Sequence, residues 1–196
     1  TETKIHSTAE LAWALIMNSW RGLQTEIQNM KDGNWQTTIG RSLKGNTLGI
    51  LGLGKQGLQV AGFGRAFGMK VIAWSHNLKK EDCEKANVEY VCSSDLFKMS
   101  DILTIHTRLS ERTQGYINKD KLKLMKKESV IVNTSRGPII KEQDLIDALN
   151  QNTISYKFDT FEKTIGIELS EKDQIKILVL ALKQMYNCLL YTSDAA

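Results

Sequence analysis

The stretch TLGILGLGKQG, residues 47–57, decides the fold. Its first part, Thr47–Leu51, is a short apolar run that predicts a buried strand. Gly52, Gly54 and Gly57 then follow in a Gly-x-Gly-x-x-Gly pattern that opens a helix. In such a turn the first glycine permits the tight bend. The second leaves room for a pyrophosphate, and the third lets the helix pack close to the strand.

The helix that follows this turn begins with Lys55 and Gln56, and its N-terminus offers free N–H groups and a partial positive charge to phosphates. We therefore include both residues in the candidate cofactor site. A tight turn with incidental glycines is the alternative. The strand–turn–helix context favours dinucleotide binding over it.

Short apolar runs and helical patterns alternate along the rest of the chain. Strands are expected at residues 70–74, 90–91, 101–106, 129–133 and 154–159, and helices at 56–67, 94–99, 119–125 and 141–151. This alternation predicts an α/β fold, a Rossmann-type doubly wound parallel sheet. Upstream, Ser7–Trp20 predicts a helix apolar on more than one side, as at a subunit interface.

Composition excludes several classes of protein. The 196 residues are 41% hydrophobic and 24% charged, with a net charge of +4, which is typical of a soluble globular chain. The lysines lie beside acids and form no aromatic-plus-basic stripe, so we expect no nucleic-acid partner. No apolar run reaches the length of a membrane span. Cys83, Cys92 and Cys188 lack metal-ligand spacing, which predicts no metal site and a reducing, cytoplasmic location.

The end of the second predicted strand bears on the choice of cofactor. Dinucleotide folds that bind NAD place an acid there for the ribose 2′-hydroxyl, whereas this chain has WSHN at residues 74–77. Ser75 and Asn77 could hydrogen-bond a ribose. Lys79 or Lys80 could pair with the 2′-phosphate of NADP, or be ordinary surface lysines. The sequence leaves NAD and NADP open.

A second polar loop, NTSRGP at residues 133–138, follows the fifth predicted strand. Ligands bind outside the carboxyl ends of strands in open α/β sheets. Arg136 could there clamp a substrate carboxylate through two parallel hydrogen bonds. An exposed arginine without a ligand is the alternative.

Four segments in this order, GILGLGKQG, SDILTIHTRLSERTQGYI, VIVNTSRGPIIKEQDLIDAL and FDTFEK, resemble the D-isomer-specific 2-hydroxyacid dehydrogenases. That family includes phosphoglycerate dehydrogenases and glyoxylate or hydroxypyruvate reductases. The resemblance implies an oxidoreductase that transfers a hydride between NAD(P) and C2 of a small D-2-hydroxy acid or 2-oxo acid. It also implies a substrate domain, largely missing here, and a homodimer with the helix at Ser7–Trp20 near the interface.

The resemblance also implies roles for particular residues. Arg136 is the expected catalytic arginine that holds the substrate carboxylate, and Asp159 is expected near the nicotinamide amide. The expected cofactor-binding residues are Gly52, Gly54, Lys55, Gln56, Gly57, Ser75, His106, Thr107, Thr134, Ser135, Arg136 and Asp159.

The acid/base pair of the family does not match. Counting from Asp159, its glutamate falls on Thr164, and the histidines of this chain are His6, His76 and His106, so none follows the last predicted strand. We therefore expect the chain to be an incomplete, inactive fragment. The alternative is a non-enzymatic NAD(H)-binding sensor or corepressor-like protein on the same fold.

The sequence after Lys163 suggests a shifted reading frame. The codons GAA CCA TTG GNN encode Glu-Pro-Leu-x, and the same bases read from the third position give Thr-Ile-Gly, the residues at 164–166. Residues 188–196, CLLYTSDAA, read like a translated sequencing adapter. We therefore expect a connecting or interface helix and loop at 1–40, a dinucleotide-binding domain at 41–163, and an unreliable tail at 164–196.

Overall fold

A parallel sheet forms the centre of the computed structural model, which describes residues 3–150 and 176–178. Its six strands have the order β3-β2-β1-β4-β5-β6. They are β1 (Thr47–Leu51), β2 (Lys70–Trp74), β3 (Glu89–Tyr90), β4 (Ile102–Ile105), β5 (Val130–Asn133) and β6 (Lys176–Leu178). The chain runs outward from β1 to β3 and then returns to β4, so the strand order reverses between β1 and β4. This confirms the doubly wound parallel sheet.

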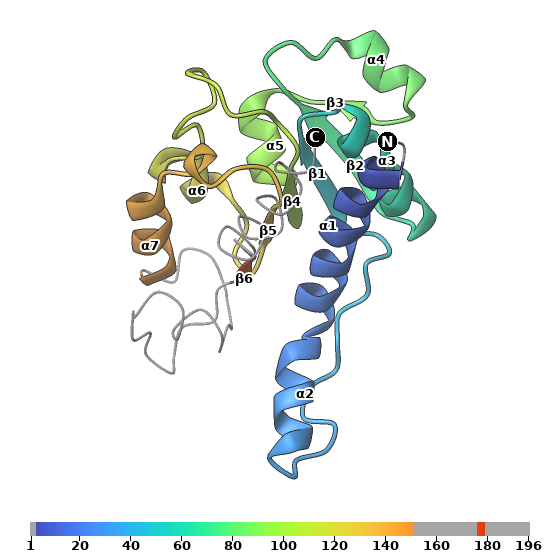
Figure 1. Cartoon of the computed structure of the whole chain (residues 1–196), viewed down its shortest axis with the longest axis vertical. Helices are drawn as coiled ribbons and strands as arrows, with labels where there is room; N and C mark the ends of the chain where they lie inside the picture. The colour runs from blue at the N-terminus through green and yellow to red at the C-terminus, as the bar shows by residue number, and fades with distance from the viewer. Residues whose placement is uncertain (1–2, 151–175, 179–196) are drawn as a thin grey trace, which may run out of the picture.

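Helices cover both faces of the sheet (Figure 1). One face carries α1 (Thr3–Arg21) and α3 (Lys55–Ala66), and the other carries α5 (Ser93–Met99), α6 (Lys119–Leu124) and α7 (Glu142–Asn150). A short helix α4 (Lys80–Lys85) precedes β3, and a 3₁₀ turn η1 (Gly137–Ile139) follows β5. Because successive strand residues point to opposite faces, Leu48 and Ile50 pack under α1 and α3, whereas Leu51 joins the core on the other side.

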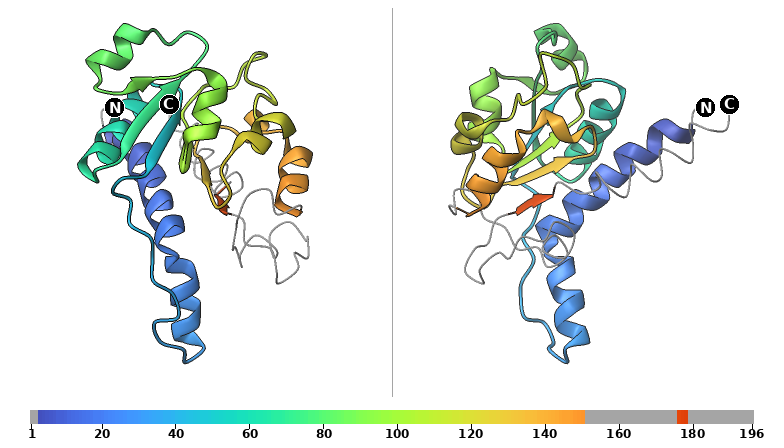
Figure 2. Two further views of the ribbon diagram at one scale, coloured as in Figure 1. Left: turned by 180° about the vertical axis from the view of Figure 1, so that it is seen from behind. Right: turned by 60° about the vertical axis from the view of Figure 1, so that its left-hand side comes forward.

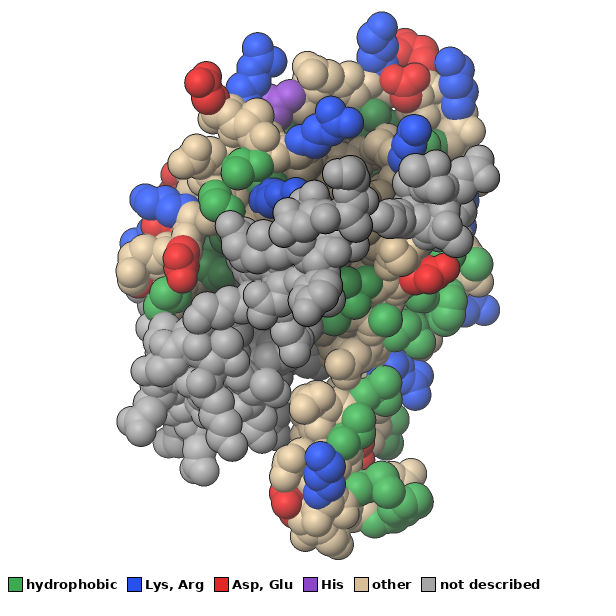
Figure 3. Space-filling model, in the orientation of Figure 1, with side chains coloured by type: hydrophobic (Ala, Val, Ile, Leu, Met, Phe, Trp, Pro, Cys, Tyr) green, Lys and Arg blue, Asp and Glu red, His purple; other side chains and the backbone are tan. Residues whose placement is uncertain are grey.

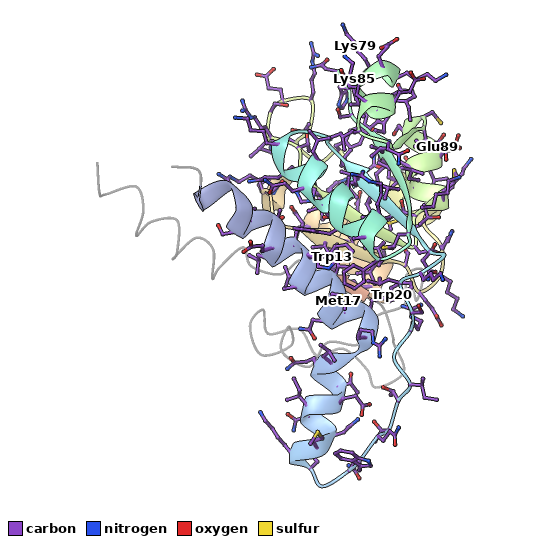
Figure 4. The ribbon with its side chains drawn as sticks, turned by 90° about the vertical axis from the view of Figure 1, so that its right-hand side faces the viewer. Trp13, Met17, Trp20, Lys79, Lys85 and Glu89 are labelled. Carbon is purple, nitrogen blue, oxygen red and sulfur yellow. The ribbon has the colours of Figure 1, made fainter. Side chains whose placement is uncertain are left out.

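Close packing of α3 against β1 depends on small residues in the helix. A Cβ atom on Gly64 would lie 2.6 Å from Leu48 Cδ2. On the outer side, α1 packs on α3 through Trp13, whose ring centre lies 5.8 Å from that of Phe63 and 5.0 Å from that of Phe67. Trp13 and Trp20 lie along the side of α1 that faces the sheet layer (Figure 4). This face of α1 is therefore part of the domain core.

An arm, residues 22–40, projects from the domain in line with α1 (Figures 1 and 2). Gly22, with φ 67°, separates α1 from α2 (Leu23–Lys31), and the chain then returns along α2. Glu26 ties the two halves together, because its carboxylate accepts hydrogen bonds from the hydroxyls of Thr37 (2.8 Å) and Thr38 (2.7 Å). These hydrogen bonds lower the pKa of Glu26, and the bond from Thr38 contributes most.

Most predicted elements match the structure to within one or two residues. The helix after the glycine turn starts at Lys55 rather than 56, and the α1 helix extends beyond the predicted range of residues 7–20 at both ends. Two helices, α2 and α4, were not predicted. The strand expected at 154–159 lies outside the described residues, as does the segment 164–196 apart from β6, which pairs with β5 in parallel.

Candidate functional site

A cleft of about 780 Å³ opens at the carboxyl ends of β1, β2 and β4. It lies where the strand order reverses, the position at which open α/β sheets bind ligands. Five of the residues expected to bind cofactor line it: Gly52, Gly54, Ser75, His106 and Thr107. The structure therefore brings together segments that lie up to 55 positions apart in the sequence, from Gly52 to Thr107.

Leu51 and Gly52 connect the end of β1 to its two neighbouring strands by hydrogen bonds at the floor of the cleft. Its N–H donates to the Trp74 carbonyl at 3.0 Å, while the His106 N–H donates to the Leu51 carbonyl at 2.8 Å. The φ of Gly52 is 101°, which disfavours any residue with a side chain. A Cβ here would also lie 2.8 Å from the carbonyl carbon of His106. Glycine is thus required for this turn.

The other two glycines have contrasting surroundings. A Cβ on Gly57 would overlap the Gly52 carbonyl oxygen, so this glycine lets α3 approach the turn. A Cβ on Gly54 would meet nothing within 4 Å, and Gly54 has a φ of −86° that any residue can adopt. Backbone geometry does not require glycine at 54. The space beside it is open to the cleft, which fits the expected place of a pyrophosphate.

The N-terminus of α3 supplies donors to the same cleft. The Leu58 N–H donates to the Gly54 carbonyl at 2.9 Å and closes the first turn of the helix. The amides of Lys55, Gln56 and Gly57 precede that bond and have no acceptor within the helix. Together with the open side of Gly54, they form a site suited to a diphosphate.

His106 is half-buried beside the glycine turn. Its Nε2 lies 2.9 Å from the Thr104 hydroxyl, and its Nδ1 is buried without a hydrogen-bond partner among the described residues. Desolvation lowers the pKa of His106 to about 4. The ring is therefore neutral at pH 7, which suits a hydrogen-bonding and packing role better than proton transfer.

Two aromatic rings pack behind His76 at one wall of the cleft. His76, which lines the cleft, packs its ring against Trp74 (4.9 Å between ring centres) and Tyr116 (5.1 Å). Trp74 and Tyr116 stack at 5.3 Å, and the Lys121 ammonium lies 4.4 Å from the centre of the Tyr116 ring. Burial lowers the pKa of Lys121 and raises that of Tyr116. Such packing fixes His76 at the wall.

The loop after β5 places Arg136 beside the cleft rather than in its lining. The Ser135 hydroxyl donates to the Ile105 carbonyl at 2.9 Å, which ties the loop to β4. Asn133 fixes the loop through two hydrogen bonds. Its Oδ1 accepts one from the Ser135 N–H (3.0 Å), and its Nδ2 donates the other to the Arg136 carbonyl (3.0 Å). Thr134 is buried in this loop, whereas Arg136 is exposed. The guanidinium of Arg136 is thus accessible to an anionic ligand.

Two expected site residues, Asp159 and Thr164, lie outside the described residues. The lysines considered for a 2′-phosphate are not in the cleft: its lining includes neither Lys79 nor Lys80, and Lys80 lies 3.9 Å from Glu84. Residues 80–85 form α4, and Lys85 of this helix is the lysine that lines the cleft.

Sequence reasoning also missed contributions to the cleft and its neighbouring loop. It did not identify His76, Lys85 or Arg112 as residues that line the cleft. It also did not identify Asn133 as the residue whose side chain fixes the loop after β5. A signal existed for Arg112, since it belongs to the same post-β4 loop as Thr107. None existed for Lys85, whose place depends on an unpredicted helix.

Comparison with known proteins identifies the family of the chain. Residues 13–185 match the family model described as the D-isomer specific 2-hydroxyacid dehydrogenase, NAD binding domain. A glyoxylate reductase of Aeropyrum pernix is 38% identical over 167 residues, which cover 80% of this chain and 50% of that protein. The chain spans about half the length of the glyoxylate reductases it matches.

Solved structures agree in fold. A putative D-3-phosphoglycerate dehydrogenase from Ralstonia solanacearum superposes with a TM-score of 0.69 at 40% identity, over 74% of this chain and 46% of that one. The apo-structure of D-lactate dehydrogenase from Escherichia coli gives a TM-score of 0.72 at 30% identity, over 78% and 49% of the two chains.

Proposed function

The chain belongs to the D-isomer-specific 2-hydroxyacid dehydrogenases, and we propose that it is the dinucleotide-binding part of an oxidoreductase acting on the CH–OH group of a small 2-hydroxy acid. The observation that carries this proposal is the cleft at the strand reversal, where Gly54 leaves open space directly before the amides of α3. We propose residues 41–163 as this domain, with α1 contributing one face to its core.

The described residues fit the nicotinamide cofactor that the family uses. Gly52, Gly54 and the first amides of α3 would hold its pyrophosphate, and Ser75 lies at the end of β2 where a ribose is bound in such folds. When bound, the nicotinamide ring supplies the chemistry of hydride transfer. The half-buried, neutral His106 adds no charge to this part of the cleft.

Arg136 is the proposed substrate-binding group. Its backbone is fixed by Asn133 and its guanidinium stays exposed at the carboxyl end of β5. A planar guanidinium binds a carboxylate through two parallel hydrogen bonds, so Arg136 can orient a 2-oxo or 2-hydroxy acid. The residue at 164 is threonine and His106 is neutral at pH 7, so we assign no group of this chain to the proton transfer.

A direct test separates binding from turnover. The 196-residue chain should bind NADH or NADPH and show no reduction of glyoxylate or hydroxypyruvate. The full-length protein, expressed from the intact gene, should reduce a 2-oxo acid with one of these cofactors. Binding by the full-length protein without turnover on a panel of 2-oxo acids would refute the enzymatic proposal in favour of a nucleotide sensor.

We further propose that the protein forms a homodimer through its arm. The helix α2 buries no side chain in its own domain, and hydrophobic side chains gather on the projecting end (Figure 3). Trp35 is 77% exposed and Ile39 is 94% exposed. A second copy of the chain is the proposed occupant of this surface. Sedimentation should show a dimer that Trp35→Ser and Ile39→Ser convert to a monomer, and an unchanged mass would refute this role.

We also propose a cytoplasmic location. Cys83 and Cys92 are free thiols in the structure, as expected in a reducing compartment. Among the helices that the structure describes, none is sufficiently long and apolar to cross a membrane. Fractionation of cells that express the full-length protein tests this location.

A further inference from the structure

The cleft is rich in basic side chains that the glycine turn does not explain. Lys85 comes from α4, and Arg108 and Arg112 come from the loop after β4, so cations reach the cleft from two separate elements. The charged residues in the lining are these three and one acid, Asp82. Lys85 lies at the α4 end of the molecule, near Lys79 (Figure 4).

These three cations have no carboxylate partner within the described part of the chain. The ion pairs there involve Arg41, Lys70, Lys80, Lys126 and Lys141. Unpaired cations in a concave site focus a positive potential and attract an anion. Guanidinium groups in particular match the geometry of a phosphate.

The loop that carries both arginines is held in one arrangement by a buried residue. The Thr113 hydroxyl accepts from the Ser110 N–H at 2.7 Å and donates to the Arg108 carbonyl at 2.7 Å. The Thr113 N–H also donates to the Ser110 carbonyl at 3.0 Å. These hydrogen bonds within residues 108–113 fix the loop backbone. The loop therefore loses less conformational entropy when an anion is bound there.

The end of β2 lacks the group that would favour an unphosphorylated ribose. A carboxylate at this place accepts a hydrogen bond from the 2′-hydroxyl in NAD-binding folds and repels a phosphate, whereas a nearby arginine accommodates the 2′-phosphate of NADP. Here the strand ends at Trp74, and the residues that follow it, Ser75, His76 and Asn77, line the cleft. No acidic side chain among residues 74–77 would repel a 2′-phosphate.

We propose that the cleft prefers a dinucleotide with a 2′-phosphate on its adenosine ribose, with Arg108, Arg112 and Lys85 as the phosphate-binding groups. This preference rests on the proposed function, because it concerns the same cofactor site. It makes NADPH, rather than NADH, the favoured reductant of the enzyme.

Equilibrium titration of the 196-residue chain tests the preference without any catalytic readout. NADPH should bind at least about tenfold more tightly than NADH at low ionic strength, and added salt should narrow the difference. Adenosine 2′,5′-bisphosphate and adenosine 5′-monophosphate, which differ only in the 2′-phosphate, should show the same order. This pair shows whether the cations act on the 2′-phosphate or only on the pyrophosphate.

Substitutions then assign the preference to residues. The double variant Arg108→Gln, Arg112→Gln should lose about tenfold in NADPH affinity and change NADH affinity by less than about twofold. Lys79→Gln, which removes a nearby charge outside the cleft lining, is the matched control and should change neither affinity. Thermal unfolding of each variant checks that the fold is retained.

Two results would overturn the proposal: NADH binding as tightly as NADPH, or a preference for NADPH that survives in the double variant. Failure of both dinucleotides to bind is a different outcome, because it would refute the proposed cofactor site itself.

Discussion

Lowering the pH from 7 to 5 should destabilise the folded chain through His106. The folded state lowers the pKa of this histidine from 6.5 to about 4 by desolvation. Below pH 6.5 the unfolded chain therefore binds a proton that the folded chain excludes, so stability is lost as the pH falls from 6.5 towards 4. Each pH unit in this range costs about 1.4 kcal/mol, so the loss between pH 7 and pH 5 is about 2 kcal/mol.

Urea unfolding followed by tryptophan fluorescence measures this loss. The variant His106→Gln retains a polar group near Thr104 but has no imidazole to protonate. Between pH 7 and pH 5, its free energy of unfolding should fall by about 2 kcal/mol less than that of the unsubstituted chain. His76→Gln, at an exposed histidine of the same cleft, is the matched control. Equal pH dependence of the His106 variant and the unsubstituted chain would refute the assignment of a desolvated, neutral His106.

Two further predictions concern the glycine turn and the substrate. Gly57→Ala should destabilise the domain by about 1–3 kcal/mol because its Cβ overlaps the Gly52 carbonyl oxygen. Gly62→Ala, whose Cβ meets only Arg65 Nη2 at 3.9 Å in the same helix, should be neutral or slightly stabilising, and equal melting temperatures for the two variants would contradict this packing. In the full-length protein, Arg136→Ala should lower kcat/KM for the 2-oxo acid by about a hundredfold or more and leave the Kd of the dinucleotide within about twofold. An unchanged kcat/KM would remove Arg136 from the site.

The parts of the fold that the sequence predicts are those with strong local signals. The run Thr47–Leu51 is bounded by Gly52, and Gly68, with a φ of 71°, follows the C-cap of α3. The strands β4 and β5 are fully buried and mostly apolar, so their composition alone identifies them. The positions of these strands and of α3 were predictable because glycines mark their ends and the strands are buried on both faces.

The missed elements lack such signals. The helix α2 buries no side chain, and the hydrogen bonds from Thr37 and Thr38 that tie the returning chain to it join residues 11 and 12 positions apart. The helix α4 has six residues and one buried side chain, Cys83, so no apolar periodicity marks it. The position of Lys85 in the cleft depends on this helix. Sequence reasoning could therefore locate the glycine turn but not Lys85, which lines the cleft from α4.

Gly54 gives the most direct test of the dinucleotide cleft, because its side opens to empty space while its backbone can accept a side chain. Titration of the Gly54→Val variant with NADH and NADPH should show at least about a tenfold loss of affinity for both. Its free energy of unfolding should stay within about 1 kcal/mol of that of the unsubstituted chain. A folded Gly54→Val variant that binds both dinucleotides with full affinity would contradict the assignment of this cleft.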